Sequence, residues 1–180
     1  MIKKILIVLI VILVVFVVIV AMQPAAYRIT RTATMSVPPA DVFAQVNDLH
    51  KFQDWSPWAK LDPGLKQTYD GASAGTGAIY SWEGNKKVGA GRMTITDSRT
   101  NELVSMKLEF LKPFASVATT DFAFKPEGNQ TSVTWSMAGE NNFMAKAFCL
   151  FMNMDKMVGG DFERGLAQLK SLVESGSKAK

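Results

Sequence analysis

The longest periodic pattern of apolar residues lies near the C-terminus, from Asn142 to about Val173. This period predicts one amphipathic helix, which at about 1.5 Å per residue would be roughly 45 Å long. So long an apolar face needs a large partner surface. The pair Gly159-Gly160 within the predicted helix indicates either a kink or a close contact with a strand. The apolar side chains recur in steps of three and four at Phe143, Ala147, Phe148, Phe151, Met154, Met157, Val158, Phe162, Leu166, Leu169 and Leu172.

Alternating apolar and polar positions fill the region before this helix. Tyr27 to Val37 predicts a first strand, a proline pair ends it, and two short helices follow, the second around Leu49 to Trp55. Six further strands, separated by turns that contain Gly, Asn or Pro, are predicted between Lys66 and Gly139. Neighbouring hairpins with one apolar face each predict an α+β fold, a curved antiparallel sheet of six to seven strands around the long C-terminal helix.

The N-terminus differs, because Ile5 through Met22 are eighteen consecutive apolar residues preceded by Lys3 and Lys4. At helical rise this run spans about 27 Å, close to the roughly 30 Å hydrocarbon core of a bilayer, and predicts one transmembrane helix. A cleaved signal peptide is the alternative, although its apolar region is usually only about 7–15 residues long. The positive charges before the span outweigh Arg28 and Arg31 beyond it, which favours a single-pass protein of the inner (cell) membrane with a cytoplasmic N-terminus and a periplasmic or extracellular domain.

These patterns divide the chain into four parts, namely an N-terminal anchor at residues 1–22, a linker at 23–26, one folded domain at 27–174 and a flexible tail at 175–180. The length fits a single domain with an appendage. The apolar fraction of 48% is raised by the N-terminus, but enough remains to build a core of ordinary size.

Charge and composition exclude several classes of function. The formal net charge is +4, of which Lys3 and Lys4 contribute two, and no basic stripe typical of a nucleic-acid binder is present. The chain has one cysteine, Cys149, and one histidine, His50, so it can form neither an internal disulfide nor a zinc site of Cys and His ligands. We therefore expect no metal, no cofactor and no nucleic-acid partner, and the oligomeric state stays open.

A series of motifs resembles the SRPBCC superfamily, which is START-like and includes polyketide cyclases and lipid-transfer proteins. The resemblance covers Tyr27 to Val173 and implies a helix-grip fold, with the order of strands and helices described above. It implies no single activity, because many members bind ligands and relatively few catalyse reactions. The motifs are Trp55-Ser56-Pro57-Trp58, Leu61-Asp62-Pro63, Tyr69, Gly75-Thr76-Gly77, Trp82-Glu83-Gly84-Asn85, Gly91-Arg92-Met93 and Met154-Asp155-Lys156-Met157-Val158-Gly159.

Aromatic and methionine residues at strand faces indicate where a ligand could bind. Plain core packing is the alternative, because aromatic residues dominate protein cores, but methionines also give a cavity an adaptable surface. A few polar groups would orient the ligand. The predicted cavity-lining residues are Trp55, Trp58, Tyr69, Tyr80, Trp82, Arg92, Met106, Phe110, Trp135, Met137, Phe151, Met154 and Asp155.

The residues support two functions. The first is non-catalytic binding or carriage of an apolar or amphipathic small molecule, lipid-like or polyketide-like, by a domain that the membrane helix holds near such ligands. The second is a cyclase or dehydratase in which Tyr80, Arg92 or Asp155 positions and protonates the substrate. The first is favoured, because the predicted inner face carries neither a histidine nor a paired acid and base, and no catalytic residue is assigned.

Overall fold

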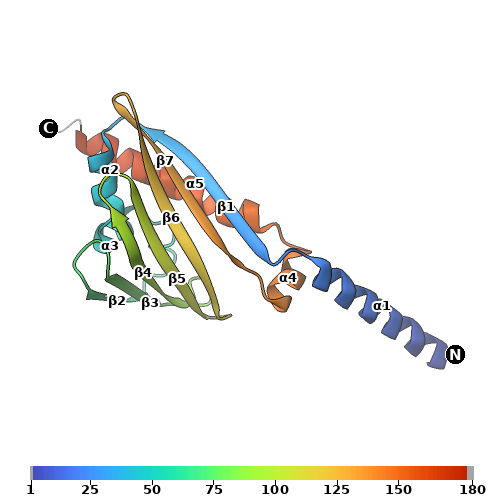
Figure 1. Ribbon diagram of the computed structural model, residues 1–180. Coiled ribbons are helices and arrows are strands. Elements are labelled where there is room, and N and C mark those ends of the chain that lie inside the picture. Colours follow the sequence, from blue (N-terminus) through green and yellow to red (C-terminus); the bar gives the residue numbers. More distant parts are fainter. Residues whose placement is uncertain (1, 178–180) are drawn as a thin grey trace.

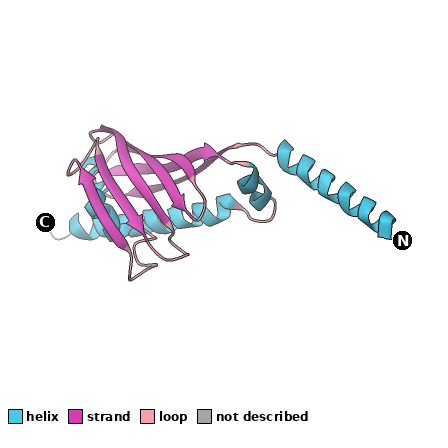
Figure 2. Ribbon diagram, turned by 90° about the horizontal axis from the view of Figure 1, so that it is seen from below, coloured by secondary structure: helices cyan, strands magenta, loops and turns pink. Residues whose placement is uncertain are grey.

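The computed structural model describes residues 2–177 and consists of one folded domain with a long N-terminal helix that projects from it (Figures 1 and 2). Seven strands form one antiparallel sheet in the order β1-β7-β6-β5-β4-β3-β2. The elements in chain order are α1 (Ile2–Met22), β1 (Ala26–Met35), α2 (Pro39–Val46), α3 (Leu49–Trp55), β2 (Lys66–Gly71), β3 (Ala78–Glu83), β4 (Ala90–Arg99), β5 (Leu103–Lys112), β6 (Ser116–Glu127), β7 (Gln130–Glu140), α4 (Phe143–Cys149) and α5 (Met154–Ser177). The predicted α+β helix-grip architecture is confirmed.

The sheet curves around α5, while α2 and α3 cover the rest of its concave face (Figures 1 and 2). The edge strand β1 pairs along its whole length with its neighbour β7, from Ala26 with Glu140 to Met35 with Thr131. The core lies between this face and the helices, and its largest fully buried side chains include Trp55, Phe122 and Phe162. The alternation of apolar and polar positions along the strands therefore predicted the buried face.

The C-terminal region is two helices rather than the one helix expected over Asn142–Val173. Helix α4 ends at Cys149, the chain turns through residues 150–153, and α5 begins at Met154. Each helix starts at an asparagine cap, because the side chain of Asn142 accepts a hydrogen bond from the Ala145 amide and Asn153 accepts one from the Lys156 amide, both at 2.9 Å. The apolar period continues across the turn, so it concealed the break.

Helix α5 runs without interruption through Gly159 and Gly160 to Ser177. The kink considered for these glycines is absent, and the close strand contact explains Gly159, since a Cβ there would lie 2.0 Å from Nη2 of Arg31 on β1. Residues 175–177 of the expected tail are helical, and residues 178–180 lie outside the described part of the chain.

Within residues 2–177, α1 is the one helix that is long and apolar enough to cross a membrane, and a signal sequence would have the same features. Its side chains are exposed over almost the whole length. Figure 1 shows it extending away from the domain beside α4.

The loops β3–β4 and β5–β6 lie at the same end of the sheet as the junction between α1 and β1. Ala26, the first residue of β1, pairs with Glu140, the last residue of β7. At the same end, β5 pairs with β6 through Phe110 and Ser116, β4 with β5 through Ala90 and Lys112, and β3 with β4 through Glu83 and Ala90. We call this edge the α1 end of the sheet. The opposite end carries α2 and the C-terminal part of α5 (Figure 1).

Candidate functional site

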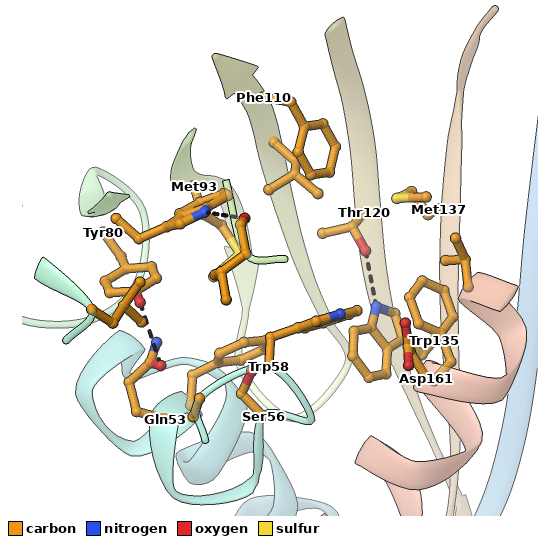
Figure 3. Close-up of a pocket in the computed structure, with 18 of the residues that line it drawn as sticks. Gln53, Ser56, Trp58, Tyr80, Met93, Phe110, Thr120, Trp135, Met137 and Asp161 are labelled. Atoms are coloured by element: carbon orange, nitrogen blue, oxygen red, sulfur yellow. Dashed lines mark hydrogen bonds between the residues drawn. The ribbon is translucent and has the colours of Figure 1, made fainter. Parts of the chain in front are cut away.

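A cavity of about 260 Å³ lies between the sheet, the turn after α3 and the first half of α5 (Figure 3). Its volume is just below the roughly 300–1,000 Å³ of typical ligand pockets. It occupies the half of the concave face nearer the α1 end, whereas the other half is filled by packed side chains. The residues that line it are Phe52, Gln53, Ser56, Trp58, Ala59, Leu65, Tyr80, Trp82, Lys87, Val88, Met93, Leu108, Phe110, Thr120, Phe122, Trp135, Met137, Val158, Asp161 and Phe162.

One wall of the cavity is an aromatic stack that joins the sheet to α5. The rings of Trp135 and Phe162 are nearly parallel at 8°, with centroids 4.0 Å apart, and Trp58 meets Trp135 edge-on at 5.9 Å. Trp135 Nε1 donates to Thr120 Oγ1, and the Thr120 hydroxyl donates to the Ser136 carbonyl, both at 3.0 Å. The polar atoms of this wall are therefore bonded to one another, and the wall offers the cavity an apolar surface.

The opposite wall is built from β3 and α3. Tyr80 and Trp82 stack along β3 with centroids 5.8 Å apart, and the Trp82 indole donates to the Val88 carbonyl at 3.3 Å. The Tyr80 hydroxyl donates to Gln53 Oε1 over 3.5 Å, a long and weak bond (Figure 3). Burial raises the pKa of Tyr80 to about 12, so at neutral pH this hydroxyl stays protonated and can donate to a ligand.

Two charged residues complete the lining, and both are accessible to solvent. Lys87 is exposed in the turn between β3 and β4, and the half-buried Asp161 on α5 forms an ion pair with Arg164. Tyr80, Lys87 and Asp161 are the ionisable groups among the described lining residues. The arrangement is an apolar chamber with a few polar groups, which suits a molecule that is mostly apolar.

Six of the thirteen sequence-predicted residues line this cavity: Trp58, Tyr80, Trp82, Phe110, Trp135 and Met137. Their alternation on β3, β5 and β7 places them on the concave face, and Trp58 comes from the turn after α3. Their role as ligand contacts stays a prediction.

Three aromatic or methionine residues of the predicted set lie close to the cavity without lining it. Trp55 is fully buried behind the wall, edge-on to Trp135 at 5.7 Å, and its indole donates to the Gln45 carbonyl. Met106 is fully buried in the packed half of β5. Tyr69 lies on edge strand β2, between Tyr80 and a stacked His50 whose ring centroid is 3.9 Å away.

Arg92 and Asp155, proposed as polar ligand contacts, face elsewhere. Arg92 is exposed between two buried neighbours, Gly91 and Met93, because consecutive residues of a strand point to opposite faces. Asp155 binds Arg31 with both carboxylate oxygens at 3.0 Å. Phe151 and Met154 lie in the turn before α5 and at its first residue, where Phe151 is 79% exposed.

The Arg31 side chain connects β1 to the first half of α5. Its guanidinium donates to both Asp155 oxygens, to the Asp155 carbonyl at 3.0 Å and to Glu163 at 2.7 Å. Hydrogen bonding to Arg31 holds the pKa of the Asp155 carboxyl below its usual value. This arginine, which interrupts the apolar face of the first strand, therefore has a structural partner in the last helix.

The sequence analysis missed much of the wall that the helices supply. Val158, Asp161 and Phe162 recur at helical spacing, so they share one face of α5, and this spacing was a usable signal. Phe52, Gln53 and Ser56 come from α3 and its C-terminal end. Leu65, Lys87 and Val88 come from loops, for which no periodic pattern exists.

Within the described residues, no group of three His, Cys, Asp or Glu side chains is arranged to hold a metal ion. The imidazole of His50 is mostly exposed, with 60% of its side-chain surface accessible, and lies outside the cavity. Cys149 is half-buried at the end of α4.

A family model described as polyketide cyclase/dehydrase and lipid transport matches residues 26–174. A search of curated proteins gives no match to the chain. Solved structures with the same fold include protein MLL2253 from Mesorhizobium loti, at 13% identity and a TM-score of 0.60 over 83% of this chain and 98% of that one.

Two further structures extend this comparison. Protein Ms6760 from Mycobacterium smegmatis is 19% identical with a TM-score of 0.58, covering 83% of this chain and 92% of that chain. The di-domain ARO/CYC StfQ from the steffimycin biosynthetic pathway is 8% identical with a TM-score of 0.61, covering 86% of this chain and 52% of that chain. At these identities the likeness shows a common fold and carries no residue roles.

Proposed function

Because this chain belongs to the polyketide cyclase/dehydrase and lipid transport family, we propose that it binds or carries an apolar or amphipathic small molecule in the cavity and performs no chemistry on it. The observation that carries the proposal is the cavity itself, whose aromatic and aliphatic wall has its buried polar atoms bonded to one another. Such a wall favours the burial of apolar surface, worth about 25 cal/mol per Å².

The polar groups at the wall suit orientation of a ligand better than catalysis. Of the three residues weighed for a cyclase or dehydratase, only Tyr80 lines the cavity, since Arg92 lies on the other face of the sheet and Asp155 binds Arg31. With a pKa of about 12, Tyr80 is a weak general acid at neutral pH, because an efficient one has a pKa near the working pH. It can still donate a hydrogen bond to the polar end of an amphipathic ligand.

The proposal includes a membrane location. Helix α1 serves as a single membrane span, with the N-terminus in the cytoplasm and the domain on the outer side. The length and hydropathy of α1 support this placement, as do Lys3 and Lys4 before the span. A tether of this kind raises the concentration of the cavity beside a bilayer, where apolar molecules collect.

Native mass spectrometry of the full chain, extracted from its own membrane, tests the binding function. We expect a co-purified small molecule on the wild-type chain and a large loss of that molecule in Ala59→Phe, because Ala59 lines the cavity and a phenyl ring there fills it. Ala123→Phe is the matched control, since Ala123 is exposed on β6 outside the cavity. A wild-type chain without bound molecule, or equal loading of both variants, would contradict the proposal.

A further inference from the structure

The segment of α4 and the turn after it, residues 143–152, carries an apolar surface that the domain leaves uncovered. Lys146 is the single charged residue in this segment. Contiguous apolar surface of this kind marks a contact with another apolar phase or partner. Its exposed side chains, with their exposed fractions, are Phe143 at 45%, Met144 at 66%, Phe148 at 52%, Leu150 at 37%, Phe151 at 79% and Met152 at 37%.

The position of the segment 143–152 is tied to the end of α1. Helix α4 packs against α1, and the Asn141 amide donates to the Ala25 carbonyl at 2.8 Å, which joins the start of α4 to the linker after α1. Val20 is fully buried, although most of α1 is exposed. Val20 lies two residues, about 3 Å, before the end of the helix at Met22, so α4 lies at the level of that end.

We propose that the segment 143–152 lies in the interface of the lipid bilayer beside α1, with lipid as the partner of its exposed face. The proposal rests on the membrane placement of α1 given above, because a spanning α1 places Met22 at the boundary between hydrocarbon and headgroups. Apolar side chains at that level enter the acyl region by about 5–10 Å, as in interfacial helices. The half-buried Lys146 can extend its ammonium group to the phosphates.

A second exposed apolar group occurs at the same end of the domain. Leu111, Phe114 and Val117, in and beside the turn between β5 and β6, are 58%, 75% and 54% exposed. Phe110 pairs with Ser116, so this turn lies at the α1 end of the sheet. A membrane at the level of α4 therefore faces the end of the sheet that carries both groups.

The consequence concerns the route of the ligand. The cavity occupies the half of the concave face nearer the α1 end, with Phe110 and Val88 in its lining. A domain held with this end on the bilayer places the cavity close to the lipid phase, from which it takes its ligand. The segment 143–152 then sets the orientation of the domain, which a single flexible tether would leave free.

Depth-dependent fluorescence quenching tests the contact on the full chain in phosphatidylcholine vesicles. Cys149→Ser removes the native thiol, and an environment-sensitive nitrobenzoxadiazole label is placed at Phe151→Cys. The matched control is Leu172→Cys, an exposed apolar residue in the distal half of α5. We expect a blue-shifted emission at position 151 and quenching by doxyl-labelled lipid at least about threefold stronger than at position 172, because interfacial side chains lie among the acyl chains.

Three other outcomes would overturn the inference. Equal quenching at both positions on chains that float with the vesicles would place the segment in water, and would leave both α1 as an anchor and ligand binding intact. A label at position 151 that is shielded from aqueous iodide but unquenched by lipid, together with cross-linked dimers, would assign this face to a second copy of the chain. Chains that do not float would overturn the membrane location of the proposed function together with this inference.

Discussion

At the scale of single residues, the join between β1 and α5 depends on Arg31 and on the absence of a side chain at Gly159. A Cβ atom at Gly159 would lie 2.0 Å from Nη2 of Arg31, so the guanidinium occupies the space that a side chain there would need. In this position the guanidinium donates hydrogen bonds to Asp155 and Glu163. The neighbouring Gly160 has no such constraint, because a Cβ there would come no closer than 3.9 Å to Arg164. Two adjacent glycines in one helix thus have different roles.

Alanine substitutions at these two glycines should have opposite effects. Gly160→Ala should raise the free energy of unfolding by about 0.5–1 kcal/mol, because alanine favours the helix. Gly159→Ala gains the same helix preference but displaces Arg31 from its carboxylate partners, so we expect a net loss of stability. Thermal unfolding of the full chain, followed by circular dichroism, measures both. Equal stabilisation by the two variants would show that Arg31 moves aside without cost.

The same scale shows what the sequence could predict about the site. Strand alternation correctly placed Tyr80, Trp82 and Phe110 on one face. The same alternation, applied to the strand that contains Arg92, would have placed Arg92 and Thr94 together on the outer face and Met93 on the inner face. The partner of Asp155 could not be predicted, because Arg31 is 124 residues away in the chain and no local pattern relates the two.

At the scale of elements, β5 illustrates the division of the sheet into a packed half and a hollow half. Met106 and Phe110 point to the same face of this strand, four residues apart. Met106 is fully buried among other core residues, whereas Phe110 is half-buried and borders the cavity. The two residues therefore allow a comparison within one strand.

Met106→Ala should lower the free energy of unfolding by about 2–5 kcal/mol, the usual cost of truncating a packed core residue. Phe110→Ala should cost less than the roughly 3–5 kcal/mol of a buried phenylalanine, because one side of its ring already meets empty space. The fraction of the chain that carries bound ligand should decrease in Phe110→Ala and stay unchanged in Met106→Ala. Denaturant unfolding and native mass spectrometry check the pair, and equal destabilisation would indicate that the cavity closes in solution.

The C-terminal helices show where periodicity fails as a guide. Apolar residues recur in steps of three and four from Phe143 to Leu172, yet the helix is interrupted between Cys149 and Met154. The pattern could not reveal the break, because the spacing does not distinguish the exposed apolar residues before it from the buried Phe162, Leu166 and Leu169 after it. Asn153 was the available signal, since asparagine favours the position just before a helix.

At the scale of the whole molecule, the proposed orientation predicts how the chain responds to protease. Protease added to intact spheroplasts should degrade the domain and spare an N-terminal fragment, because the domain lies outside the inner membrane. Complete protection until the membrane is broken would mean the reverse orientation. A soluble form that begins after Ala21 would instead identify α1 as a cleaved signal sequence, consistent with its position at the N-terminus.

The most direct measurement of the central claim is a crystal structure of the full chain, purified from its own membrane without added ligand. We predict continuous electron density for a mostly apolar molecule in the cavity of about 260 Å³, against the Trp135–Phe162 stack and with any polar end near Tyr80. A cavity that is empty, or one that Trp58 closes by packing against Tyr80 and Trp82, would contradict ligand binding at this site.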